Sequence, residues 1–182
     1  MSRAQTGDRE AFDRLATAVY DRLFAVARRI LGDDYDAEEA VQESLIHGWR
    51  DFRSLRDPAR FDAWMYRVLI NCCRDQGRRR HRMRVEVPDL AVERSDPANQ
   101  YARVVDADEL ERGFLELPLE HRVVLVVTHY LGMSAPEAAQ ILGIPTWTVY
   151  SRLHYGMRAM RAALDAQSRP ALPPQVRLEV PR

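Results

Sequence analysis

Apolar residues recur every three or four positions along the first part of the chain, the spacing of one buried helix face. A first helix is predicted from Asp8 to Gly32, a residue that commonly ends helices. A second is predicted with Asp36 as its cap, and a third with Asp57 and Pro58 at its start. The residues predicted to face the core are Phe12, Leu15, Val19, Leu23, Val26, Ala27 and Ile30, then Ala40, Val41, Leu45 and Gly48, then Phe61, Met65, Val68, Leu69 and Cys72.

The helical pattern stops between about 83 and 105, where prolines and charges predict a linker. It resumes at Asp106, which is predicted to cap a helix together with Glu109, and Pro118 is predicted to start another. After Gln167 the chain is rich in proline and is expected to be disordered. The predicted fold is all-α, with two small helical domains, a three-to-four-helix domain at 1–83 and a second at 106–167. They are joined by a flexible linker at 84–105 and followed by a tail at 168–182.

The second domain ends in a stretch that predicts two helices joined by a tight turn. Ser134 and Glu137 have the spacing of a capping box, Gly143 suits the turn, and Pro145 suits entry into the next helix. The inward residues of the last helix are predicted to be Val149, Leu153, Gly156, Met157, Met160 and Leu164. An ordinary helical hairpin is the alternative, but this geometry is typical of a helix-turn-helix that places its second helix in the major groove of DNA.

The chain has a formal net charge of zero, yet its charges are segregated. An acidic block covers 33–43, and an arginine-rich block covers 74–84. DNA phosphates would repel the acidic block, which therefore favours a basic protein surface. The arginines favour phosphate contacts. We expect the two blocks to occupy separate surfaces.

Other chemistry is sparse. Cys72 and Cys73 are neighbours without metal-ligand spacing, which indicates buried, reduced thiols. Glu43 and His47 lie one helical turn apart, but no further set of ligands accompanies them, so neither a metal site nor a cofactor is expected. An enzyme is the least favoured class. With no apolar signal segment and no run long enough to span a bilayer, a cytoplasmic protein without membrane contact is expected.

Two sets of motifs resemble the extracytoplasmic-function (ECF) sigma factors of bacterial RNA polymerase. The first set is the run 36–43, the run 61–67, Asn71 with Asp75, and the arginines at 78–80. The second is Leu117-Pro118, Arg122 and the runs 134–139 and 148–153. The resemblance implies a non-catalytic protein that recruits core RNA polymerase to promoters and helps to melt DNA. The implied partners are core polymerase, through its β′ clamp and its β subunit, promoter DNA as duplex and melted strand, and in many family members an anti-sigma factor.

The resemblance also implies sites within the first domain. The residues expected to contact the polymerase clamp are Asp36, Glu38, Glu39, Gln42 and Glu43. The residues expected to hold the melted minus-ten element are Arg53, Arg56, Trp64, Arg67, Asn71, Arg74, Arg78 and Arg79. Trp64 has an equally good interpretation as a core residue.

The last helix would recognise the minus-thirty-five element as duplex. Its candidate contacts are Thr146, Trp147, Thr148, Tyr150, Ser151, Arg152, His154, Tyr155 and Arg158. Trp147, Tyr150 and Tyr155 depart from the glycine and basic residues common in the family. Because Arg and Lys make the commonest specific contacts to guanine, an altered or weak preference is expected here. The main alternative is a non-sigma helix-turn-helix regulator whose N-terminal half is a sensor or dimerisation domain.

Overall fold

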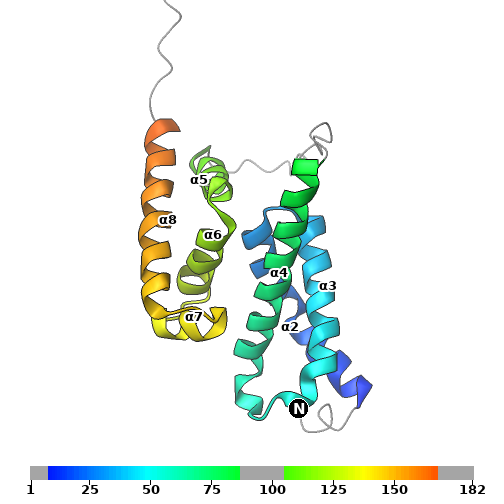
Figure 1. Ribbon diagram of the computed structural model, residues 1–182. Coiled ribbons are helices and arrows are strands. Elements are labelled where there is room, and N and C mark those ends of the chain that lie inside the picture. The colour runs from blue at the N-terminus through cyan, green and yellow to red at the C-terminus, as the bar shows by residue number, and fades with distance from the viewer. Residues whose placement is uncertain (1–7, 87–104, 168–182) are drawn as a thin grey trace, which may run out of the picture.

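The computed structural model describes residues 8–86 and 105–167, which form two groups of helices (Figure 1). The N-terminal bundle contains α2 (Arg9–Leu31), α3 (Asp34–Asp51) and α4 (Phe61–Glu86), with the 3-10 turns η1 (Phe52–Ser54) and η2 (Pro58–Arg60) between α3 and α4. The C-terminal domain contains α5 (Val105–Glu116), α6 (Leu119–Leu125), the π-helical turn η3 (Val126–Tyr130), α7 (Ala135–Leu142) and α8 (Thr146–Gln167). The described ranges contain no strand, as the predicted all-α fold requires.

Local signals set the ends of the helices. Gly32 adopts a left-handed conformation with φ of 78° and ends α2, as predicted. The cap of α3 is Asp33 and not Asp36: an Asp33 side-chain oxygen accepts a hydrogen bond from the Asp36 backbone N–H at 2.9 Å. The helix therefore starts earlier than predicted, because the first of several aspartates in the run takes the capping position. Asp57 caps η2 by accepting from the Ala59 N–H at 3.0 Å, and Pro58 follows it.

The N-terminal bundle is held by the predicted apolar stripes and by a cluster of aromatic rings at one end. Most stripe residues are buried; Leu15, Leu45 and Val68 are partly exposed. Phe52, which is 1% exposed, lies at the centre of the ring cluster. Its ring packs edge-on against Phe12 at a centroid distance of 5.4 Å and against Phe61 at 5.8 Å. This packing fixes the connection between α3 and α4 at the end of the bundle.

The core of the C-terminal domain is aliphatic. Val123 and Val127, before and within the π-helical turn, are fully buried together with Ala138 of α7 and Val149 of α8. The predicted inward stripe of α8 is confirmed except at Met157, which is 44% exposed. Met157 lies at the edge of the stripe, about 80° around the helix from Val149 at 100° per residue.

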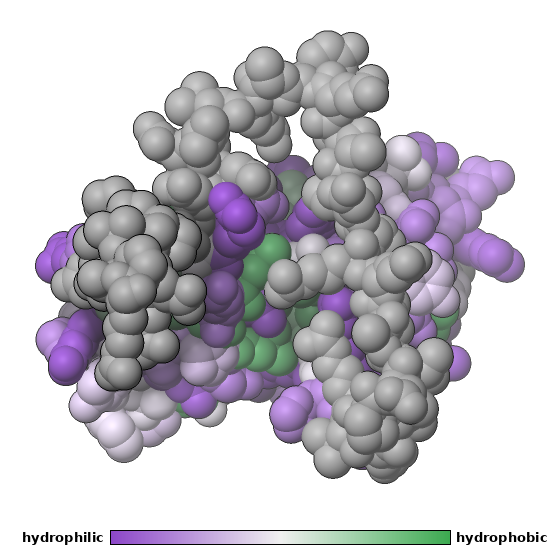
Figure 2. All heavy atoms as spheres, turned by 90° about the horizontal axis from the view of Figure 1, so that it is seen from above, coloured by the Kyte–Doolittle hydropathy of each residue, from purple (hydrophilic) through white to green (hydrophobic). Residues whose placement is uncertain are grey.

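The two groups of helices pack against each other, so the expectation of two domains held only by a tether is wrong for this arrangement. Contacts join α4 to α6 and α7, and α2 to α6 and η3, and a single apolar core runs through both groups. Figure 2 shows hydrophobic atoms at the middle of one face, with hydrophilic atoms on both sides. The predicted tail and nearly all of the predicted linker lie outside the described residues; α4 extends to Glu86 and α5 begins at Val105.

Candidate nucleic-acid and protein interfaces

The outer face of α3 combines two of the predicted polymerase contacts with exposed apolar side chains. Glu38 and Gln42 are exposed. Tyr35 is 75% exposed and Ile46 is 51% exposed, and their positions three or four residues away place them on the same helix face. Sequence reasoning missed Tyr35 and Ile46, although their spacing from Glu38 and Gln42 was visible. The face is an acidic and apolar surface suited to another protein.

The other three acidic candidates face α4. Arg80 donates to Asp36 at 2.6 Å, Gln76 donates to Glu39 at 2.7 Å, and Arg79 donates to Glu43 at 3.0 Å. The expectation that the acidic and arginine-rich blocks occupy separate surfaces is therefore wrong for these pairs. The physical reason is topological: α3 and α4 run antiparallel, which brings the start of α3 beside the second half of α4.

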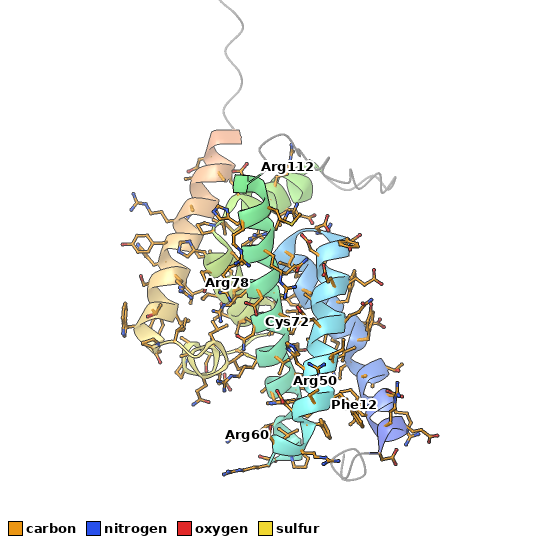
Figure 3. All side chains as sticks on the ribbon, turned by 45° about the vertical axis from the view of Figure 1, so that its right-hand side comes forward. Phe12, Arg50, Arg60, Cys72, Arg78 and Arg112 are labelled. Atoms are coloured by element: carbon orange, nitrogen blue, oxygen red, sulfur yellow. The ribbon has the colours of Figure 1, made fainter. Side chains whose placement is uncertain are left out.

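The remaining basic candidates are exposed on the N-terminal bundle. Arg67 and Asn71 are exposed one turn apart on α4, and Arg78 continues this stripe while pairing with Asp75. Figure 3 shows Arg78 partway along α4 and Arg60 at the opposite end of the helix. Arg53 and Arg56, in the connection before η2, are also exposed. The structure thus brings cationic groups and an amide into one accessible surface, a combination able to hold phosphates and a base edge.

Arg74 is an exception to this stripe. It is only 9% exposed, and its guanidinium donates to Glu120 Oε2 at 3.0 Å and to the Leu142 carbonyl at 3.4 Å. Its Nε atom is buried without a hydrogen-bond partner. The expectation that Arg74 lies free for nucleic acid is wrong in this arrangement, because the C-terminal domain covers this part of α4.

Trp64 belongs to the ring cluster. Its indole packs against Phe52 at a centroid distance of 6.1 Å and against Phe61 at 6.3 Å, and it is partly exposed. Of its two interpretations, the structure favours a residue at the edge of the core.

The helix-turn-helix has the predicted local chemistry. The Glu137 carboxylate accepts hydrogen bonds from the Ser134 backbone N–H at 2.8 Å and from its hydroxyl at 2.6 Å. These bonds lower the pKa of Glu137. Gly143 has φ of 64° and ends α7, a conformation that few other residues tolerate. Together they orient the start of α8 outward from α7.

The exposed face of α8 is aromatic. Trp147 is 72% exposed, Tyr150 is 60% exposed and Tyr155 is 56% exposed. The remaining candidates divide into two groups, with His154 and Arg158 exposed and Thr146, Thr148, Ser151 and Arg152 partly exposed. Arg152 differs from the others because it donates to Glu120 at 2.6 Å, so the surface open to a partner has few cations.

The cysteines are buried and free, as predicted. Burial raises the pKa of Cys72 to about 12, with Glu43 as the second cause, and burial also raises the pKa of Cys73. Within the described residues, no group of three or more His, Cys, Asp or Glu could hold a metal ion. The search of the described helices for a stretch apolar and long enough to cross a membrane found none.

Two protein-family models match the chain, one to each group of helices. Sigma-70 region 2 matches residues 15–83, and Sigma-70, region 4 matches residues 107–160. The boundaries follow the N-terminal bundle and the helices that end in α8.

Curated relatives match both parts in order. ECF RNA polymerase sigma factor SigL of Mycobacterium tuberculosis is 37% identical over 83% of this chain and 89% of its own length. ECF RNA polymerase sigma factor SigE of Mycolicibacterium smegmatis is 33% identical over 90% of this chain; the match covers 66% of that protein. A solved complex of the sigma factor RpoE with the anti-sigma factor NepR from Bartonella quintana has the same fold, with a TM-score of 0.70 at 22% identity over 86% of this chain and 98% of that one. With both regions present and relatives above 30% identity, the chain belongs to the ECF subfamily of RNA polymerase sigma factors.

Proposed function

We propose that this sigma factor divides promoter recognition between α4 and α8 and binds core polymerase through the outer face of α3. The observation that carries the proposal is the presence, in one chain, of an exposed Arg67–Asn71 stripe on α4 and an exposed aromatic face on a helix-turn-helix. The first suits a separated strand, because guanidinium and amide groups can hold phosphates and base edges. The second suits the major groove of a duplex.

On α3, the contact with polymerase is proposed to centre on Glu38 and Gln42, flanked by Tyr35 and Ile46. Apolar and aromatic side chains that become buried supply most of the affinity of such interfaces, whereas rim charges mainly set orientation. Asp36, Glu39 and Glu43 would contribute only where the partner displaces their bonds to α4.

Co-purification with core polymerase and transcription from promoter DNA test the proposal. Gln42→Arg places a cation in the proposed contact and is expected to abolish association with core polymerase. Asp21→Arg, an exposed change on α2, is the control and is expected to leave association intact. Equal association of the two variants would contradict the assignment of α3.

Asn71→Ala tests the other half. It is expected to leave polymerase association unchanged and to lower run-off transcription, because the lost contact acts only on the opened strand. An equal loss of association and transcription would instead indicate a general structural defect.

The setting of this activity follows from the partners. Sigma factors are not enzymes, and we propose that this one acts in the cytoplasm, where polymerase and promoters are found. We also propose an anti-sigma factor as a regulatory partner, by analogy with the solved RpoE–NepR complex. Capture of an anti-sigma protein encoded beside this gene, in competition with core polymerase, would test that partnership.

A further inference from the structure

Glu120, near the start of α6, joins the two halves of the molecule. Its Oε2 atom accepts from Arg74 of α4 at 3.0 Å and from Arg152 of α8 at 2.6 Å. Both arginines are candidate nucleic-acid contacts, one for the melted strand and one for the duplex. A single carboxylate therefore occupies a cation from each of the two promoter-binding surfaces.

The surfaces around this carboxylate fit each other. A Cβ atom at Gly77 of α4 would lie 2.5 Å from Leu119 Cδ2, so the leucine occupies the space that the missing side chain leaves. Leu115 packs in the same way against Gly32. Beside them, the Arg29 guanidinium lies 3.9 Å from the centroid of the Tyr130 ring. Apolar, aromatic and ionic contacts thus hold one defined arrangement.

We propose that this closed arrangement is a self-inhibited state of the free sigma factor, with Glu120 as the latch that withholds Arg74 and Arg152 from promoter DNA. The proposal rests on the proposed division of promoter recognition between α4 and α8. It adds a conformational step: the two groups of helices must separate before both surfaces can act.

The spacing of promoter elements gives an independent reason for separation. Elements at minus ten and minus thirty-five lie about 25 base pairs apart, or roughly 85 Å along a duplex at about 3.4 Å per step. Compact domains of roughly 60 and 80 residues have radii of gyration of about 10 to 12 Å, so two that touch have centres roughly 25 Å apart. The closed form is too short to engage both elements. The segment 87–104, at about 3.3 Å per residue, has a contour length of roughly 60 Å, which permits the required separation.

The closed form also contains an electrostatic cost that favours release. Arg122 of α6 has a buried Nε atom with no hydrogen-bond partner. Burial lowers the pKa of Arg122 to about 10, and Arg80 of α4 lowers it further as a like charge across the contact. Arg80 is neutralised by Asp36 at 2.6 Å. A partner that displaces Asp36 would leave Arg80 and Arg122 to repel each other, and this would help the two groups of helices to separate.

Removing the latch carboxylate tests the proposal on the full chain without polymerase. Glu120→Ala is expected to raise the radius of gyration, measured by small-angle X-ray scattering, by several Å above that of the wild type. The matched control is Glu116→Ala, which removes the same charge from an exposed position on α5. Affinities for a random-sequence 20-nucleotide strand and a 20-base-pair duplex are expected to rise at least about fivefold relative to the control, because binding no longer requires opening.

A steric variant separates opening from charge. Gly77→Leu is expected to displace Leu119 and give the same expansion and the same gain in affinity, whereas Ala18→Leu, on an exposed position of α2, is expected to change neither. If Gly77→Leu fails to fold, the Glu120→Ala comparison decides alone. A radius of gyration and DNA affinities for Glu120→Ala equal to those of Glu116→Ala would overturn the proposal. Because no polymerase is present, that result would leave the promoter assignment standing, and loss of polymerase association in the α3 variants would leave the latch untouched.

Discussion

Arg79 of α4 donates a hydrogen bond to Glu43 of α3 at 3.0 Å, so a proposed strand contact and a proposed polymerase contact neutralise each other. The Glu43 bond is the largest cause of the raised pKa of Arg79. Both side chains are partly accessible, so a partner on either side can compete for its half of the pair. The promoter surface and the polymerase surface of the N-terminal bundle are therefore adjacent and electrostatically coupled.

The coupling predicts opposite effects of one substitution on two partners. Arg79→Gln frees Glu43, and its association with core polymerase is expected to tighten by about two- to fivefold, the range for one exposed ion pair. Binding of the resulting holoenzyme to a single-stranded minus-ten oligonucleotide is expected to weaken. Surface plasmon resonance measures the first quantity and fluorescence anisotropy the second. Arg67→Gln, on an exposed position of the same helix, is the control: it is expected to weaken strand binding without altering polymerase affinity.

Much of the architecture was predictable, because helix periodicity and caps are local properties. The stripe from Phe12 to Ile30, the end of α2 at Gly32 and the turn at Gly143 all appear as predicted. The error at Asp36 arose because several aspartates compete for one capping position, and only the backbone path selects Asp33.

The nonlocal contacts were not predictable. Glu120 meets Arg74 across 46 positions and Arg152 across 32, and no spacing rule relates residues so far apart. The same holds for Arg80 and Asp36. Residue type identified the charged candidates, but it could not show which of them pair with one another, and this decides which are free for a partner.

The aromatic face of α8 predicts an unusual duplex preference. Selection of bound duplexes from a random library is expected to yield a minus-thirty-five element without the guanine-rich core that arginines recognise. Tyr150→Arg is expected to add a guanine preference at one position, worth about 1–3 kcal/mol of discrimination against the other bases. Met157→Arg adds the same charge at an exposed position near the edge of the buried stripe, and it is expected to raise affinity for all sequences equally. A guanine preference already present in the wild type would contradict this prediction.

The ring cluster predicts a large stability effect at Phe52. Phe52→Ala removes a nearly fully buried ring that contacts Phe12, Phe61 and Trp64, and it is expected to cost about 3–5 kcal/mol of unfolding free energy. Trp49→Ala, at the 37% exposed rim of the cluster, is expected to cost clearly less. Urea denaturation followed by circular dichroism measures both. Equal losses in the two variants would show that the ring cluster has no centre at Phe52.

The buried thiols predict a loss of stability in alkali. Burial raises the pKa of Cys72 from 9.0 to about 12, so the folded state keeps a proton that the unfolded state releases between these values. The resulting stabilisation is complete below pH 9 and is lost as the pH rises from 9 towards 12. Cys72→Ala is expected to show a shallower fall of the urea midpoint between pH 8.5 and 10.5 than the wild type. The folded wild type is also expected to react slowly with a thiol reagent at pH 8, where almost no Cys72 thiolate is present, and rapidly once it is unfolded. An unchanged pH slope in Cys72→Ala, together with fast modification of the folded protein, would place the thiol in an environment more open to water than the one described.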